Sequence, residues 1–177
     1  EGSIIKTLDW SGYRRFFYYN NGLYHYSINK LEKFSLDGDL LWTFDVPEMT
    51  PGGVSFEATG TLLFYGYCTF CSSGFMKRLT QGGVEVGSIT GYGGNFNARF
   101  PLVFDSYGHV YFGDNAYYGS TVSLDENLQF KWKTDRSSSI TMLNDDIFIV
   151  VYYRSYEDYM MTQVNRADGS TIREYDM

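Results

Sequence analysis

The sequence predicts an all-β fold of repeated, four-stranded antiparallel units, and three observations lead to this prediction. The chain has 177 residues, of which 19% are aromatic, with 17 Tyr and 14 Phe, and it holds 19 Gly against 3 Pro. Aromatic side chains favour the pleated surface of strands, and Gly permits tight turns. One sequence phrase recurs along the whole chain, and no segment of ten or more residues has a helical period. We therefore expect strands joined by short turns and essentially no helix.

The repeated phrase is clearest at residues 37–45, which read Asp-Gly-Asp-Leu-Leu-Trp-Thr-Phe-Asp. Related phrases begin near residues 1, 81, 123 and 168. The turn markers that we assign to them are Gly2, Gly38, Gly82, Asn127 and Gly169, so the steps by subtraction are 36, 44, 45 and 42. Gly and Asn tolerate the positive φ of hairpin turns. Each phrase is therefore predicted to be a β-hairpin.

A second pair of strands is predicted before each hairpin. These pairs are 15–19 with 23–28, 54–58 with 61–67, 102–104 with 109–113, and 140–143 with 147–153. Each period then contains four short strands in about 40–45 residues, which is the size of one β-propeller blade. An antiparallel sandwich or a closed barrel would share the strands but would not require a fixed period. We therefore predict a β-propeller of four-stranded antiparallel blades.

The phrases also set the expected organisation of the chain. We expect a single β-propeller segment over 1–177, with an outgoing strand at 1–9 and about four blades, at approximately 12–46, 53–90, 98–135 and 138–177. This arrangement has five outgoing strands but four sets of the other strands. A closed ring would have equal numbers. We therefore expect a segment of a larger propeller, with a homodimeric eight-blade ring or a four-blade ring with a spare strand as alternatives.

Two stretches resemble the repeat of a known family. Residues 35–44 and 123–132 resemble the repeat of the quinoprotein-like (PQQ-type) β-propellers, and residues 104–112 resemble the strand-turn-strand that precedes it. The resemblance implies that Trp42 and Trp132 pack between adjacent blades. In the other phrases, this position is predicted to hold Lys6, Val86 and Arg173. The family includes quinone-dependent dehydrogenases and also propellers that serve as assembly scaffolds, so the repeat implies a fold rather than an activity.

Charge limits the classes of partner. The formal net charge is −7 and the isoelectric point is about 4.7. Binding to phosphates requires a basic surface, so we expect neither a nucleic-acid partner nor an anionic membrane partner. No apolar run approaches the roughly 20 residues of a membrane span. The compartment stays open, although the resemblance and the Tyr-rich, Lys-poor composition favour the cell envelope or the exterior.

The sequence offers no clear reactive site, so we predict no catalytic, cofactor-binding or metal-binding residue. Cys68 and Cys71 form a single Cys-x-x-Cys, and the only histidines are His25 and His109. A zinc site needs about four ligands, and a redox motif is expected at the start of a helix. We expect a possible disulfide between the two cysteines, or two free thiols. Both histidines are expected to be ordinary strand residues.

Three Tyr-rich stretches are candidates for recognition. They are the Gly-rich loop 91–97, residues 117–119 and residues 152–156, with Tyr92, Tyr117, Tyr118 and Tyr156 as the candidate binding-loop aromatics. Tyr can anchor a protein partner or stack on a sugar, but it can also pack between blades. We expect a non-enzymatic scaffold that binds a protein partner or self-assembles. The alternatives are a carbohydrate-binding, lectin-like propeller and a fragment of a quinone-dependent dehydrogenase.

Overall fold

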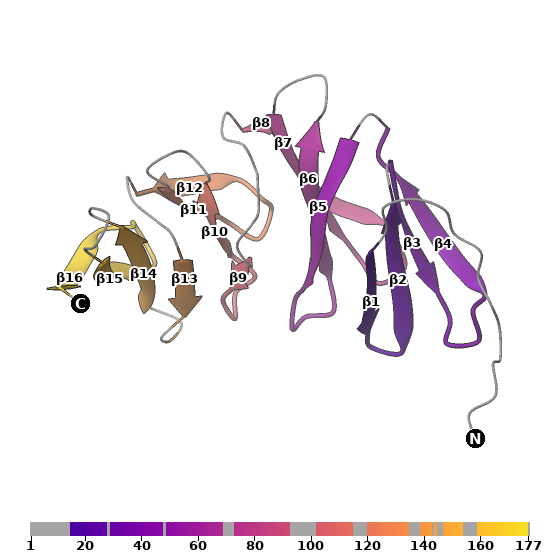
Figure 1. The fold of residues 1–177 in the computed structure, drawn as a ribbon, viewed down its shortest axis with the longest axis horizontal. Helices are drawn as coiled ribbons and strands as arrows, with labels where there is room; N and C mark the ends of the chain where they lie inside the picture. The colour runs from indigo at the N-terminus through magenta and orange to yellow at the C-terminus, as the bar shows by residue number, and fades with distance from the viewer. Residues whose placement is uncertain are drawn as a thin grey trace.

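The computed structural model describes residues 15–27, 29–47, 49–68, 73–92, 102–114, 120–134, 139–142, 144, 147–153 and 159–176. These residues contain sixteen β-strands and no helix, as the sequence predicts. The strands form four separate sheets of four strands each (Figure 1). The predicted outgoing strand at 1–9 lies outside the described residues.

Each sheet is an antiparallel meander of four strands that are consecutive in the chain. The first sheet contains β1 (Arg15–Tyr19), β2 (Gly22–Ser27), β3 (Lys30–Phe34) and β4 (Leu40–Asp45). The second contains β5 (Met49–Phe56), β6 (Leu62–Cys68), β7 (Ser73–Leu79) and β8 (Glu85–Tyr92). The third contains β9 (Val103–Phe104), β10 (Val110–Asp114), β11 (Ser120–Leu124) and β12 (Phe130–Lys133). The fourth contains β13 (Ser139–Met142), β14 (Ile147–Tyr153), β15 (Tyr159–Asn165) and β16 (Thr171–Asp176). The second sheet extends beyond the expected range of 53–90 at both ends.

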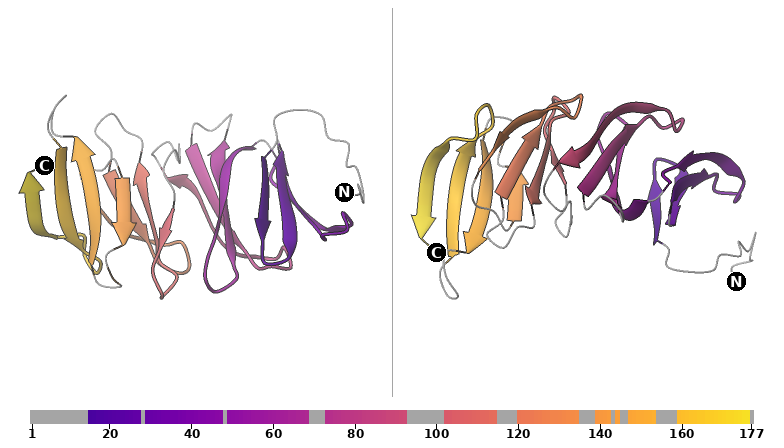
Figure 2. Two further views of the ribbon diagram at one scale, coloured as in Figure 1. Left: turned by 60° about the horizontal axis from the view of Figure 1, so that its bottom comes forward. Right: turned by 90° about the horizontal axis from the view of Figure 1, so that it is seen from above.

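The four sheets follow one another in chain order as an open row. Figure 1 and the two views of Figure 2 place β1–β4 at one end of the long axis and β13–β16 at the other. Neighbouring sheets contact each other through their first and second strands, as β2 does with β5, and β9 and β10 do with β13. The fourth strand of each sheet is therefore the outer border of its sheet.

Three apolar clusters fill the spaces between consecutive sheets. Alternation along β6 shows how one strand serves two of them. Leu62 and Phe64 belong to the cluster shared with the first sheet, whereas Leu63 and Tyr65 belong to the cluster shared with the third. Successive strand residues point to opposite faces, so a sheet that is covered on both sides has a nearly continuous apolar run. The third cluster joins Tyr111 and its neighbours to the fourth sheet.

The hairpins between third and fourth strands are the repeated phrases, but two of the predicted turn markers are wrong by one residue. The positive φ values occur at Gly38, Gly83, Leu128 and Gly169, rather than at Gly82 and Asn127. In the second sheet, Gly83 N donates to Thr80 O, and Thr80 N donates to Val84 O. This pattern encloses a three-residue loop whose last residue is left-handed, so the second glycine of the pair takes that conformation.

Candidate functional site

Trp42 lies on β4 and reaches the hairpin turn of the next sheet. Its Nε1 donates a hydrogen bond of 2.8 Å to Gln81 O, in the turn between β7 and β8. Its ring lies directly against Gly83, where a Cβ would be 2.7 Å from Trp42 Cδ2. A glycine is therefore needed at position 83 for two reasons: its φ is 80°, and the Trp42 ring leaves no room for a Cβ.

Trp132 repeats this arrangement two sheets later. Its Nε1 donates a 2.8 Å hydrogen bond to Arg166 O, in the turn between β15 and β16. A Cβ on Gly169, whose φ is 74°, would be 2.7 Å from Trp132 Cε3. The first and the third inter-sheet spaces thus contain the same tryptophan-turn contact. That this contact docks the blades stays a prediction, for which a test is given in the Discussion.

In the second inter-sheet space, the glycine and the large side chain have exchanged places between the strand and the turn. Strand pairing places Gly87, not Val86, at the tryptophan position, because Gly87 pairs with Arg78 as Trp42 pairs with Lys33. The predicted assignment of Val86 to this position is therefore wrong, because the left-handed residue of this turn is Gly83 rather than Gly82, which moves the equivalent position from residue 86 to residue 87.

In the same space, the left-handed turn residue is Leu128 rather than Gly, with a φ of 62°. The Leu128 side chain is fully buried, and a Cβ on Gly87 would be 3.7 Å from Leu128 Cγ. In this space the large apolar side chain therefore comes from the turn. In the other two spaces it comes from the fourth strand of the preceding sheet. Burial of a leucine side chain contributes about 2 kcal/mol, which offsets the cost of the left-handed backbone.

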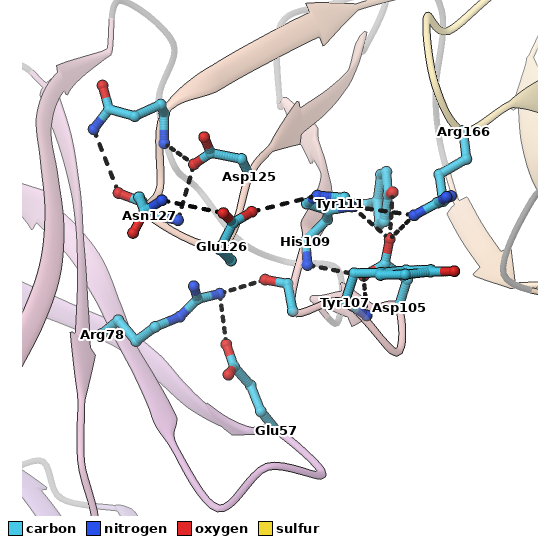
Figure 3. A network of polar contacts seen from close by, with 12 residues as sticks. Glu57, Arg78, Asp105, Tyr107, His109, Tyr111, Asp125, Glu126, Asn127 and Arg166 are labelled. Atoms are coloured by element: carbon cyan, nitrogen blue, oxygen red, sulfur yellow. Dashed lines mark hydrogen bonds and ion pairs between the residues drawn. The ribbon is translucent and has the colours of Figure 1, made fainter.

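A polar network lies beside these contacts and joins the second sheet to the third (Figure 3). Arg78 Nη2 is 2.7 Å from Glu57 Oε1, and both side chains are buried. The same Nη2 donates a 2.7 Å hydrogen bond to Gly108 O, in the turn between β9 and β10. The buried guanidinium therefore has its carboxylate partner in one sheet and a carbonyl acceptor in the next.

Asp105 is the centre of the second half of the network. Its Oδ2 accepts hydrogen bonds from Tyr111 OH at 2.9 Å and from Arg166 Nη1 at 2.9 Å, and it lies 2.7 Å from His109 Nδ1. Its Oδ1 accepts from the backbone N–H groups of Tyr107 and His109. Arg166 comes from the fourth sheet, so this carboxylate ties the third sheet to the fourth.

The electrostatics of Asp105 are those of a fixed anion. Burial alone would raise the pKa of its carboxyl group, but the hydrogen bonds from Arg166, His109 and Tyr111 outweigh burial and lower that pKa. Burial and the neighbouring carboxylate raise the pKa of the Tyr111 hydroxyl. A carboxylate with this many donors is a poor proton acceptor. The arrangement is suited to holding sheets together rather than to acid–base chemistry.

His109 and Tyr107 carry the network to the surface. His109 lies in the turn immediately before β10, rather than in a strand as expected, and its Nε2 is 3.5 Å from Glu126 Oε2. Tyr107 is 61% exposed, and Arg166 Cζ lies 4.5 Å from the centre of its ring. Asp105 and Arg166 were not predicted from the sequence as members of a site. The order Asp-x-x-Gly-His is a readable signal for the turn that Asp105 caps, but its partner Arg166 is 61 residues away.

Of the remaining predicted residues, only Cys68 and Tyr92 belong to the described part of the chain, and both lie at the opposite edge of the sheets. Cys71, Tyr117, Tyr118 and Tyr156 lie outside the described residues. Cys68 is the last residue of β6 and Tyr92 is the last residue of β8, and only their backbones are described. In a meander, all even-numbered strands run in the same direction. The strands that end at Cys68, Tyr92, Asp114 and Tyr153 therefore end at one edge, opposite the turns that carry the polar network.

The described part of the chain shows neither a metal cluster nor a membrane-spanning helix. It contains no cluster of three or more His, Cys, Asp or Glu side chains placed to hold a metal ion. Within the same residues, no helix is long and apolar enough to cross a membrane.

Comparison with known proteins supplies the name of the architecture. No family model and no curated protein matches the chain. Among solved structures, it is similar to BamB from Moraxella catarrhalis, with a TM-score of 0.69 and 11% identity over 90% of this chain and 47% of that one. It is also similar to the Neurospora crassa Pan2 WD40 domain, with a TM-score of 0.61 and 13% identity over 92% of this chain and 51% of that one. The Dos1 propeller matches with a TM-score of 0.61 and 13% identity over 89% of this chain and 45% of that one.

The chain has the β-propeller fold. Its four sheets are the blades, and the repeat-level resemblance to propellers that the sequence shows is supported by these structures. At these low identities the similarity defines the fold alone. The chain spans about half the length of the three structures, between 45% and 51%.

Proposed function

We propose that this β-propeller chain is a non-enzymatic scaffold that binds a protein partner or self-assembles through the edge of the blades where the even-numbered strands end. The observation that carries this proposal is the difference between the two edges. One edge consists of short turns that are tied across the blades by the Trp42 and Trp132 contacts and by the network around Asp105. The other edge receives the Tyr-rich connections and the longest connection between the described strands, which runs from Tyr92 to Val103.

One connection differs clearly in length from the rest. By subtraction, ten residues separate Tyr92 from Val103 at the even-strand edge, whereas no connection between described strands at the opposite edge has more than five. The other connections of the two edges are similar in length, so the division depends on their composition and on the contacts that tie the opposite edge. Variable loops on a rigid framework are the usual place for recognition, because a rigid framework loses little entropy on binding.

The composition of three connections at this edge, 93–102, 115–119 and 154–158, points to a protein partner. They or their borders hold Tyr92, Tyr117, Tyr118 and Tyr156. Tyr provides a large, rigid contact area together with a hydroxyl group, and it is enriched in protein-binding loops. The net charge of −7 favours a partner with a basic surface.

The test is an affinity-enrichment experiment with three forms of the protein. The loop variant changes all four loop tyrosines to Ser, and the control changes Tyr18 to Ser. Tyr18 is an exposed tyrosine on β1, outside the loop edge. We expect a partner recovered with wild type and control to bind the loop variant at least about tenfold more weakly, with unchanged thermal unfolding.

Three results would contradict the proposal. Equal recovery of every partner by wild type and loop variant would remove the Tyr-bearing edge from binding. A glycan-array signal that the loop variant loses would favour the carbohydrate-binding alternative. Quinone-dependent alcohol oxidation by the intact protein would favour the dehydrogenase alternative.

A further inference from the structure

A set of apolar side chains lies exposed on the outer border of every blade. The set, called the apolar stripe below, consists of Leu40, Leu41, Val84, Val86, Phe130 and Ile172. Their exposed fractions lie between 49% and 62%. Single exposed apolar residues are common and need no explanation, whereas a set that repeats in every blade does.

The placement repeats from blade to blade. Each hairpin has one left-handed residue, and the stripe residue follows it by one to three positions. Leu40 and Leu41 follow Gly38, and Phe130 follows Leu128. Val84 and Val86 follow Gly83 in the second blade, and Ile172 follows Gly169 in the fourth. All four blades thus present apolar bulk within three residues of the left-handed turn residue, at or next to the start of the fourth strand.

The stripe residues lie outside the apolar clusters that pack the blades together. β4, β8, β12 and β16 are each the last strand of a sheet, so they form its outer border (Figure 1). The three apolar clusters between the blades are built from other residues. These clusters therefore do not account for the large apolar side chains that are half exposed at this border in all four blades.

Acidic side chains accompany the stripe. Asp37 and Asp39 are exposed beside Leu40, Glu85 lies between Val84 and Val86, and Glu126 precedes Phe130 in its hairpin. In the fourth blade, Asp168 is exposed in the turn before Ile172.

Basic groups do not balance the acids of the hairpin turns within the same turns. The hairpin turns described at 35–39, 80–84, 125–129 and 165–170 contain one basic residue, Arg166, and it is bound to Asp105. Outside the turns, Lys77 Nζ lies 3.2 Å from Glu85 Oε1, and Lys131, Lys133 and Arg173 lie further along the outer strands. Negative charge therefore accompanies the apolar bulk at the turn end of the border.

We propose that the apolar stripe is a second binding surface, and that its occupant is a segment of another protein that alternates apolar side chains with Lys or Arg. Charge complementarity selects this occupant. A second copy of the chain would bring another −7 of net charge to an acidic border, and an anionic membrane would be repelled in the same way. The stripe is separate from the Tyr-bearing edge, so either surface can fail without the other.

The geometry favours binding through side chains rather than through addition of a strand. Each pair of third and fourth strands has a register shift near its hairpin, at Lys33/Phe34, Arg78/Leu79, Ser123/Leu124 and Gln163/Val164. Bulges of this kind twist an outer strand and reduce its ability to pair with another strand. The stripe lies beside these bulges.

The probe is a twelve-residue peptide of alternating Leu and Lys, labelled for fluorescence anisotropy. Two control peptides carry Glu in place of Lys, or Ser in place of Leu. The stripe variant combines Leu40→Ser, Val86→Ser, Phe130→Ser and Ile172→Ser. The matched control variant combines Thr43→Ala, Ser88→Ala and Thr171→Ala, which are exposed polar positions on three of the same outer strands.

We expect the Leu-Lys peptide to bind wild type and control variant alike, and to bind the stripe variant at least about tenfold more weakly. We also expect Asp37→Asn with Glu85→Gln to weaken binding and to reduce its salt dependence. Thermal unfolding of the stripe variant should match that of wild type, because the changed side chains lie on the surface.

Four results would overturn the proposal. Equal binding to wild type and stripe variant would mean that the stripe does not bind the peptide. Equal binding of the Glu peptide would refute charge complementarity, and equal binding of the Ser peptide would refute the apolar contribution. Concentration-dependent dimerisation of wild type that the stripe variant loses would assign the surface to a second copy of the chain.

Discussion

The contact between Gly169 and Trp132 can be tested with a single methyl group. In Gly169→Ala, the new Cβ would lie 2.7 Å from Trp132 Cε3, a separation that side chains do not tolerate. The indole has little freedom to move away, because its Nε1 is bonded to Arg166 O and the ring is buried. The methyl group must therefore displace the indole or the turn.

The expected cost has two parts, which a control variant separates. A left-handed backbone costs a non-glycine residue about 1–2 kcal/mol, and crowding of a packed side chain adds about 1–3 kcal/mol. Gly108→Ala has the backbone cost alone. The φ of Gly108 is 83°, but its new Cβ would be 3.6 Å from Glu126 Cβ, which is an ordinary contact. We expect Gly169→Ala to lower the free energy of unfolding by about 3 kcal/mol and Gly108→Ala by about half of that.

The assay is equilibrium unfolding in urea, followed by circular dichroism and by tryptophan fluorescence. The decisive measurement is Gly169→Ala in the Trp132→Ala background, where the crowding is absent and only the backbone cost should remain. The coupling energy between the two sites should then be about 1–3 kcal/mol. A coupling energy near zero, or equal destabilisation by Gly169→Ala and Gly108→Ala, would refute the assigned docking contact.

Three further predictions concern the second blade interface, the network and the cysteines. Leu128→Ala should lower the free energy of unfolding in urea by about 2–4 kcal/mol. Gly87→Trp should be tolerated only together with Leu128→Gly, because the two side chains would occupy the same space. A double variant that is less stable than both single variants would contradict the exchange of glycine and large side chain between strand and turn. Because the folded-state pKa of Asp105 is lowered, its carboxylate stabilises the fold above the unfolded-state pKa and loses that effect as pH falls below about 4. Asp105→Asn should lower the free energy of unfolding by about 2 kcal/mol at pH 7, and it should reduce the loss of stability that wild type shows as the pH falls below about 4. An unchanged loss of stability at low pH would show that other carboxyl groups control it. If Cys68 and Cys71 form a disulfide, the intact mass of unreduced protein will be lower by the two thiol hydrogens, and an unchanged mass after reduction would leave two free thiols.

The local signals in the sequence predicted the strands well. The expected strand at 15–19 coincides with β1, and the expected strand at 147–153 coincides with β14. These signals are readable because alternation and turn residues act over a few neighbouring positions. The same locality explains the recognition of four hairpins in register.

The residues that join the blades were only partly predictable. Trp42 and Trp132 stood out because they repeat, but Gly83 and Gly169 become their partners only when consecutive blades pack together. Leu128 was not recognised as the residue at the turn position, since a leucine with positive φ contradicts every local preference. Its conformation is explained by burial against the neighbouring blade.

The sequence by itself determined the all-β class, the four-strand period and the position of the hairpins, because these follow from contacts between near neighbours in the chain. Only the tertiary structure decided which side chains cross from one blade to the next. Asp105 and Arg166 are separated by 61 residues and carry no local pattern that pairs them. Their ion pair exists because two turns from successive blades meet at one edge, and that meeting depends on how whole sheets pack.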